Sequence, residues 1–149
     1  MADGQAAGVV PPRVSIITLG VADLGAATAF YESLGWTRSP ASVELMTLFT
    51  MQGSVLGLYE WGALADDAGV PADGSGFRGV ALALNCASEA DVDTVFAAWV
   101  AAGAIATKAP HKAFWGGYSS YVADPDGHLW EIAYNPYSRL DEQGILRID

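Results

Sequence analysis

Strand and helix periodicities follow one another in the first third of the chain. An apolar, β-branched run at 14–21 predicts a strand, and apolar positions at helical spacing in 24–34 predict an amphipathic helix after it. Asp23 is a suitable N-cap, because its side chain can accept a hydrogen bond from a free backbone N–H, and Gly35 is suited to follow the last turn. A strand and a helix therefore open the patterned part of the chain.

Three strands are predicted after this helix. The first is short, at 36–38, and two apolar runs follow at 43–51 and 55–61. The connection at 52–54, Gln-Gly-Ser, has the composition of a tight turn between antiparallel strands. From 62 to 77 the sequence becomes small and acidic, which predicts a linker rather than a helix or strand.

The second half repeats this plan. A strand is predicted at 80–84, and a helix follows the Ser-Glu-Ala-Asp segment at 88–91, which resembles a capping box. Two further strands, at 118–123 and 129–134, flank an Asp-Pro-Asp-Gly turn at 124–127. The pattern therefore predicts a duplicated α+β domain, although the two halves share little sequence identity.

The predicted organisation is one structural domain made of two modules. Its parts are an N-terminal flexible tail (1–13), a first module (14–62), a linker (63–77), a second module (78–136) and a C-terminal tail (137–149). The C-terminal tail is polar with scattered apolar residues, so it is expected to fold back on the domain or onto a second subunit.

Length and charge narrow the possible functions. The 149 residues are 52% hydrophobic, enough for one compact domain and too few for two ordinary ones. Seven Lys and Arg against seventeen Asp and Glu give a net charge of −10, which repels nucleic acid and anionic membrane surfaces. No nucleic-acid or membrane partner is expected, and cationic or neutral partners are favoured.

The single cysteine and the N-terminal segment favour a cytoplasmic location. Cys86 has no partner for an internal disulfide and is interpreted as a small buried apolar residue. Residues 1–12 lack the pattern of a signal peptide, and no apolar run approaches the length of about 20 residues that a membrane span needs.

Alternation along the first strand of each module separates a bulky face from a small one. Ile16, Thr18 and Gly20 lie opposite the bulky residues of 14–21, and a Gly-Ala-Ala face is predicted in 79–85. A small face leaves room either for a ligand or for facing side chains, and the pattern does not decide between them. The tryptophans at 36, 99 and 130 are assigned to the core.

Three pieces of sequence resemble the vicinal oxygen chelate superfamily, which includes glyoxalase I, extradiol dioxygenases and bleomycin-binding proteins. They are Val-Ala-Asp-Leu at 21–24 followed by Phe-Tyr-Glu-Ser-Leu-Gly-Trp at 30–36, Trp-Gly-Gly at 115–117, and Asp-Pro-Asp-Gly-His-Leu-Trp-Glu at 124–131. The resemblance spans 14–136. It implies two βαβββ modules that form a concave, partly open barrel of mixed sheet with helices outside, and a homodimer.

In metal-dependent members of that superfamily, one ligand comes from the first and one from the last long strand of each module. The corresponding positions here are Ile16, Gly57, Gly79 and Glu131, of which only Glu131 can bind a metal. A catalytic divalent ion needs three or four donors. The resemblance therefore implies a member with a depleted metal site, without a tightly bound metal or other cofactor.

An alternative keeps a divalent metal (Zn, Ni, Mn or Fe) on Glu131 with ligands from unusual positions. His128 has the opposite strand parity to Glu131 and should face away from it, and His111 is placed in a loop. A ligand from a partner subunit would also serve this alternative.

Aromatic and small residues on the predicted concave face suit a planar organic ligand. The residues expected to line the ligand site are Ile16, Thr18, Gly57, Tyr59, Trp61, Gly79, Ala81, Trp115, Tyr118 and Tyr121.

Glu131 is the candidate catalytic residue, with three roles left open. It can act as the charge partner of a basic ligand, as a general base beside a carbonyl compound, or as a structural carboxylate bonded to the first strand, for example to Thr18. The first hypothesis is a metal-independent protein that binds a small aromatic or cationic molecule, as in the bleomycin-resistance branch. The alternative is a lyase, isomerase or dioxygenase of the same superfamily. A third reading has the pocket filled by side chains.

Overall fold

The computed structural model describes residues 9–148. The first half contains β1 (Ile16–Val21), α1 (Leu24–Ser33), β2 (Met46–Thr50), β3 (Val55–Glu60) and α2 (Trp61–Ala68). The second half contains β4 (Ala81–Asn85), α3 (Glu89–Ala101), β5 (Ile105–Lys112), β6 (Tyr118–Ala123), β7 (Leu129–Tyr134), β8 (Arg139–Leu140) and β9 (Leu146–Arg147). No helix in this described part is both long and apolar enough to cross a membrane.

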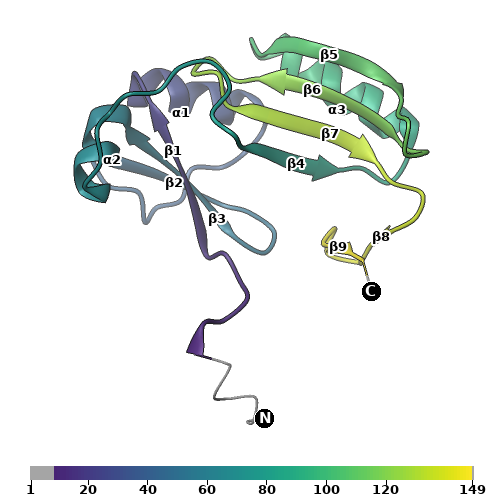
Figure 1. The fold of residues 1–149 in the computed structure, drawn as a ribbon, viewed down its shortest axis with the longest axis horizontal. Helices are drawn as coiled ribbons and strands as arrows, with labels where there is room; N and C mark the ends of the chain where they lie inside the picture. The colour runs from purple at the N-terminus through teal and green to yellow at the C-terminus, as the bar shows by residue number, and fades with distance from the viewer. Residues whose placement is uncertain (1–8, 149) are drawn as a thin grey trace.

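Each half builds its own sheet. The first sheet has the order β1-β3-β2 and the second has the order β4-β7-β6-β5, and in each the first strand runs parallel to the last strand of its module. Figure 1 shows the two open sheets side by side, with α3 behind the second one. The prediction of an α+β fold with two related modules is confirmed.

The strand predicted at 36–38 is wrong, because this segment makes only an isolated bridge between Arg38 and Phe49. Ser39 donates one further backbone hydrogen bond to Leu48, and Pro40 then interrupts the ladder because it has no N–H. The predicted run at 43–51 starts later, at Met46, because Val43 and Met46 close a tight turn. Each of these departures depends on local turn chemistry that hydrophobic periodicity does not record.

The segment from 62 onward was expected to lack regular structure, and this prediction is wrong for its first part. Helix α2 begins after Glu60, whose side chain accepts a hydrogen bond from the Ala63 N–H, and ends at Gly69 in a left-handed conformation with φ of 75°. Alanine and leucine supply helix propensity between these two caps. Residues 69–80 have no helix or strand.

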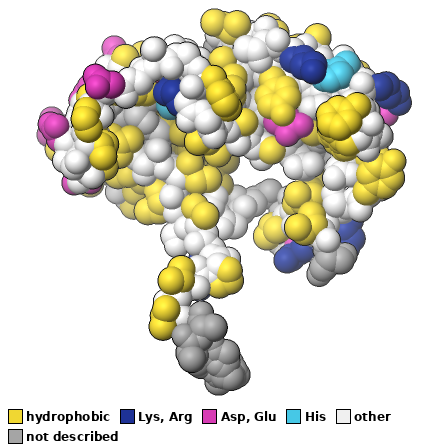
Figure 2. All heavy atoms as spheres, in the orientation of Figure 1, with side chains coloured by type: hydrophobic (Ala, Val, Ile, Leu, Met, Phe, Trp, Pro, Cys, Tyr) yellow, Lys and Arg dark blue, Asp and Glu magenta, His cyan; other side chains and the backbone are white. Residues whose placement is uncertain are grey.

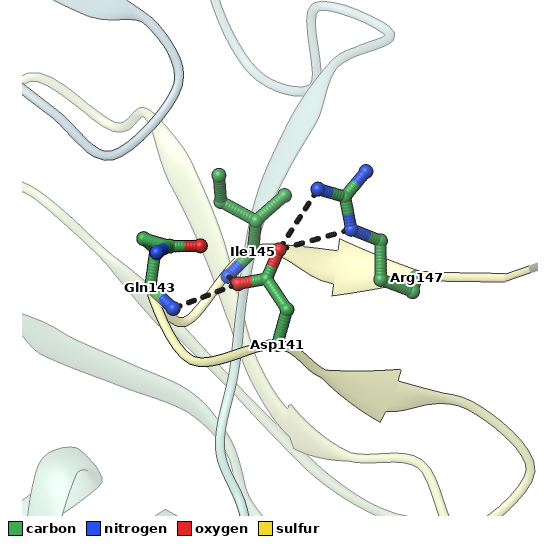
Figure 3. A network of polar contacts seen from close by, with 4 residues as sticks. All are labelled: Asp141, Gln143, Ile145 and Arg147. Carbon is green, nitrogen blue, oxygen red and sulfur yellow. Dashed lines mark hydrogen bonds and ion pairs between the residues drawn. The ribbon is translucent and has the colours of Figure 1, made fainter.

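The C-terminal tail forms a small hairpin, β8 with β9, held by one carboxylate (Figure 3). Asp141 accepts hydrogen bonds from the backbone N–H groups of Gln143 and Ile145, each at 2.9 Å, and forms an ion pair with Arg147 at 2.8 Å. These contacts, led by the Ile145 N–H, hold the pKa of Asp141 below its ordinary value. Within the described residues, this tail therefore turns back on itself.

An aromatic cluster joins the two modules behind the sheets. Tyr31 of α1 stacks on Trp36 at 5.5 Å between ring centroids, and Trp99 of α3 contacts Trp130 of β7 at 5.1 Å. Trp36 and Trp99 meet edge to face at 5.9 Å. Trp99 and Trp130 are buried and Trp36 packs against them, which confirms their assignment to the core.

A buried hydrogen-bond network runs through the same cluster. Tyr31 donates through its hydroxyl to Asp124 at 2.6 Å, and Trp130 donates through Nε1 to the Tyr31 oxygen at 3.1 Å. The other carboxylate oxygen of Asp124 accepts from the backbone N–H groups of Asp126 and His128, at 2.9 and 2.8 Å. Because Tyr31 lies in the first module and Asp124 in the second, this network connects the modules as well as the turn.

Candidate functional site

The second sheet has one face covered by α3 and one open face. Val122, Trp130 and Ile132 point toward α3 and are buried in the core. The open face is defined by the residues of opposite parity, which are Ala81, Ala83 and Asn85 on β4, Leu129, Glu131 and Ala133 on β7, and Ser119, Tyr121 and Ala123 on β6. Figure 2 shows this face, with hydrophobic rings beside an acidic side chain.

Glu131 lies at the middle of the open face. The Ser119 hydroxyl donates to its Oε2 at 2.7 Å, and Tyr121 lies directly opposite Glu131 on β6. Burial, followed by the negative charge of Glu131, raises the pKa of Tyr121. The Tyr121 hydroxyl is therefore a neutral neighbour of the carboxylate.

Thr18 on the first strand, the example given for a structural partner of Glu131, does not hold this carboxylate. The contact comes from Ser119 because β6 is the neighbour of β7 in the sheet, whereas β1 belongs to the other sheet. Ser119 lies two residues before Tyr121 and so has the same strand parity. That parity is the sequence signal that would have identified Ser119.

Trp115 lies at one end of the open face. A Cβ at Gly117 would overlap the Trp115 ring and lie 2.7 Å from the Tyr134 carbonyl oxygen, so only glycine fits beneath this ring. Gly117 has the parity of Ser119, which places Trp115 on the same side of the sheet as Glu131. Trp115 and Tyr121 are therefore the two predicted aromatic residues that the fold places on this face.

Tyr118 is placed differently from the prediction. Its hydroxyl donates to Asp93 on α3 at 2.8 Å, so it lies on the helix-covered side of the sheet. This contact, followed by burial and the charges of Asp93 and Glu89, raises the pKa of Tyr118. Three residues separate Tyr118 from Tyr121, so strand alternation places the two rings on opposite faces.

His111 was expected in a loop and instead lies in β5, opposite Ser119. Lys108 on the same strand lies opposite Tyr121. Pro110 makes this segment look like a loop in the sequence. However, β5 is the edge strand of the sheet, and its register with β6 shifts on both sides of Lys108. A proline is tolerated on such an irregular edge because no ladder bond is required of it.

His128 faces the first module rather than Glu131. Its Nε2 donates to the Gly20 carbonyl at 2.7 Å, and its Nδ1 accepts from Arg78 at 3.2 Å. The ring stacks on Trp61 at 6.2 Å, and Arg78 lies over the same indole at 5.1 Å. These contacts make His128 part of the connection between modules.

The predicted positions in the first module share a face of the first sheet, apart from Trp61 in α2. Ile16 is 50% exposed, and Thr18 pairs with Gly57. A Cβ at Gly57 would lie 2.7 Å from the Met46 methyl group and 3.3 Å from the Thr18 hydroxyl, so these side chains already occupy the space above it. Tyr59 lies two residues after Gly57 on β3, on the same face, and pairs with Met46.

Two further predicted residues lie at the edges of this arrangement. Trp61 begins α2, and its Nε1 donates to the Ala72 carbonyl at 2.7 Å. Gly79 was predicted to be a strand residue that faces the ligand. This prediction is wrong, because Gly79 precedes β4 and has a φ of 78°. Ala81 starts β4 on the open face and is exposed.

Within one chain, the predicted site residues therefore form two groups on two sheets. A hollow of about 490 Å³ lies between the sheets, lined by residues such as Ile17, Leu82 and Leu146. Glu131 does not line this hollow, although Ala81, Ala83 and Asn85 of the open face do.

The donors around Glu131 do not fit a bound divalent metal. Among residues 9–148, no group of three or more His, Cys, Asp or Glu side chains is close enough to hold a metal ion. Ser119 and Tyr121 add only hydroxyl groups, of which that of Ser119 already donates to Glu131, and Ile16 and Gly57 have no donor atoms in their side chains. One carboxylate with two neighbouring hydroxyl groups lacks the ligand set of a zinc or iron site.

Two modules that each place a parallel strand pair beside a crossing helix define a glyoxalase-type fold, and the comparisons agree. Residues 13–132 match the family model described as "Glyoxalase/Bleomycin resistance protein/Dioxygenase superfamily". The chain belongs to this superfamily. Comparison with curated proteins finds no match.

Solved structures support the same assignment. A glyoxalase-related enzyme from Fulvimarina pelagi is 36% identical, with 91% of this chain and 97% of that chain covered and a TM-score of 0.81. A glyoxalase/bleomycin resistance protein/dioxygenase from Nocardioides is 27% identical, with 85% of each chain covered and a TM-score of 0.71. Lactoylglutathione lyase from Agrobacterium tumefaciens is 22% identical over 84% of this chain and 95% of that chain, with a TM-score of 0.63, and shares the fold.

Proposed function

We propose that this protein binds a small organic cation, about the size of one aromatic ring with its substituent, on the open face of the second sheet, without a tightly bound metal. Glu131 is the charge partner of the ligand. Tyr121 lies opposite it, Trp115 adds flat apolar surface at the end of the same face, and Ala83 leaves room beside it. The proposal assigns the protein to the binding branch of its superfamily and gives no catalytic role to Glu131.

The observation that carries this proposal is the surroundings of Glu131. Its carboxylate accepts from the neutral Ser119 hydroxyl and lies opposite the neutral Tyr121, so its negative charge is oriented but not neutralised. The other direct ladder partner of Glu131 is Ala83 on β4, which offers no cation. A partly buried, unneutralised carboxylate on an apolar surface favours a cationic partner, because pairing offsets the cost of removing the charge from water.

The proposed test is binding of benzylamine, a cation at neutral pH, against benzyl alcohol, its neutral analogue of similar shape. Isothermal titration calorimetry is expected to detect benzylamine and not the alcohol. Glu131→Gln is expected to weaken benzylamine binding about tenfold or more, since a hydrogen bond to a charged group contributes about 1.5–3 kcal/mol. Glu44→Gln, on an exposed residue outside the open face, is the matched control and should bind as the parent does.

Two results would contradict the proposal. Equal binding of the amine and the alcohol would show that charge at Glu131 plays no part. Stoichiometric metal in protein purified without chelators, and its loss in Glu131→Gln, would restore the metal-dependent lyase, isomerase or dioxygenase reading.

The ligand site is completed, in this proposal, by a second copy of the chain. Ala81 and Ala83 are exposed on the second sheet, and Ile16, on the first, is 50% exposed. A homodimer that sets the first sheet of one copy over the second sheet of the other would cover these apolar positions and enclose Glu131. The expected cytoplasmic location stays a prediction.

Light scattering after gel filtration is expected to give twice the mass of one chain. Ile16→Lys should shift the protein toward the monomer, because it would place a charge in the covered apolar surface. Val43→Lys is the control, since Val43 is 60% exposed in a turn away from β1. A parent protein that stays monomeric at micromolar concentration would refute the dimer.

A further inference from the structure

Strand β5 carries a local group of basic residues, although the protein as a whole is acidic. The chain has seven Lys and Arg and a net charge of −10, yet both of its lysines, Lys108 and Lys112, lie on this one strand together with His111. Figure 2 shows basic and histidine side chains gathered at the upper right, where β5 runs in Figure 1. Charges of this sign on one strand require an explanation beyond the composition.

The two lysines face different sides of the sheet. Lys112 lies opposite Tyr118, which faces α3, and forms an ion pair with Glu89 of that helix at 2.6 Å. Lys108 lies opposite Tyr121, on the open face, and among the described residues the structure gives it no ion pair. Protection of an exposed sheet edge accounts for a lysine on β5, but not for the alignment of Lys108 with the residues of the candidate site.

A continuous row of paired residues crosses the open face. Lys108 on β5 pairs with Tyr121 on β6, Tyr121 pairs with Glu131 on β7, and Glu131 pairs with Ala83 on β4. Adjacent strands lie about 4.8 Å apart, so the backbone positions of the cation and the carboxylate are roughly 10 Å apart. Tyr121 lies between them in this row.

The row therefore presents a negative and a positive group whose separation is greater than the distance in a direct ion pair. From this we infer that the ligand is zwitterionic, with its ammonium group on Glu131, its carboxylate on Lys108 and its apolar middle over Tyr121. The inference rests on the proposed function and adds the second charge of the ligand. His111 lies in the adjacent row, opposite Ser119, where its ring adds to the positive end of the site when it is protonated.

The experiment compares 4-(aminomethyl)benzoate with benzylamine and with 4-(aminomethyl)benzamide, in which a neutral amide replaces the carboxylate. Calorimetry on the parent protein is expected to show the zwitterion binding about tenfold tighter than either amine. The gain should shrink as salt is raised, because Lys108 is exposed to solvent. Lys108→Gln should remove this gain without weakening the binding of benzylamine, which has no carboxylate for Lys108 to pair with.

Lys112→Gln is the matched control, because it removes the same charge from the same strand on the opposite face, and it should keep the gain. Equal affinities of the zwitterion and benzylamine, with Glu131→Gln still weakening both, would overturn this inference and leave the proposed function standing. A gain that survives Lys108→Gln would also overturn it. Absence of any binding that depends on Glu131 would instead refute the proposed function itself.

Discussion

Asp124→Ala is expected to lower the free energy of unfolding by about 3–4 kcal/mol, because it leaves several buried donors unsatisfied at once. Asp124 is 2% exposed and accepts from the Tyr31 hydroxyl and from two backbone N–H groups of its own turn. Without the carboxylate, the turn between β6 and β7 and the contact between modules lose their common acceptor. Urea denaturation followed by circular dichroism and by tryptophan fluorescence would measure the change.

Asp93→Ala provides a matched control for this experiment. Asp93 also accepts from a tyrosine hydroxyl, that of Tyr118 at 2.8 Å, but at an exposed site. Water can replace that contact, so a loss below about 1 kcal/mol is expected. Equal losses for the two variants would show that the buried network around Asp124 does not connect the modules as described.

Stability is expected to fall as pH rises above about 10, the range in which an unfolded tyrosine loses its proton. Burial, followed by the charge of Asp124 and the hydrogen bond to it, raises the pKa of Tyr31 far above its ordinary value. The folded state then keeps a proton that the unfolded state releases, so the stabilisation is complete below the unfolded pKa and is lost at higher pH. Urea denaturation repeated between neutral pH and pH 11 would measure this slope.

Tyr31→Phe isolates the contribution of this residue. The variant should be less stable at neutral pH, because Asp124 loses a donor, and its stability should fall less steeply above pH 10. A smaller slope from Tyr118 and Tyr121 should remain, since the pKa of each is also raised. An unchanged alkaline slope in Tyr31→Phe would contradict the assignment to Tyr31.

The candidate site was only partly predictable from the sequence. The resemblance to the superfamily identified Glu131, and Trp115 and Tyr121 were among the aromatic residues predicted to line the ligand site. Tyr118 was predicted there as well, although alternation from Tyr121 turns its ring toward α3. Lys108 was missed because its proline-containing strand has no clear alternation, and only the register with β6 shows which face it joins.

The sequence alone determined the duplicated order of strands and helices, the shortage of metal donors at the superfamily positions, and Glu131 as the central carboxylate. These properties are local, since they depend on periodicity and on residue type. The tertiary structure decided which positions meet: Ser119 rather than Thr18 holds Glu131, Met46 fills the space above Gly57, and Lys108 shares a row with Glu131. Such contacts depend on which strands become neighbours, and strand order is set by packing between segments far apart in the chain.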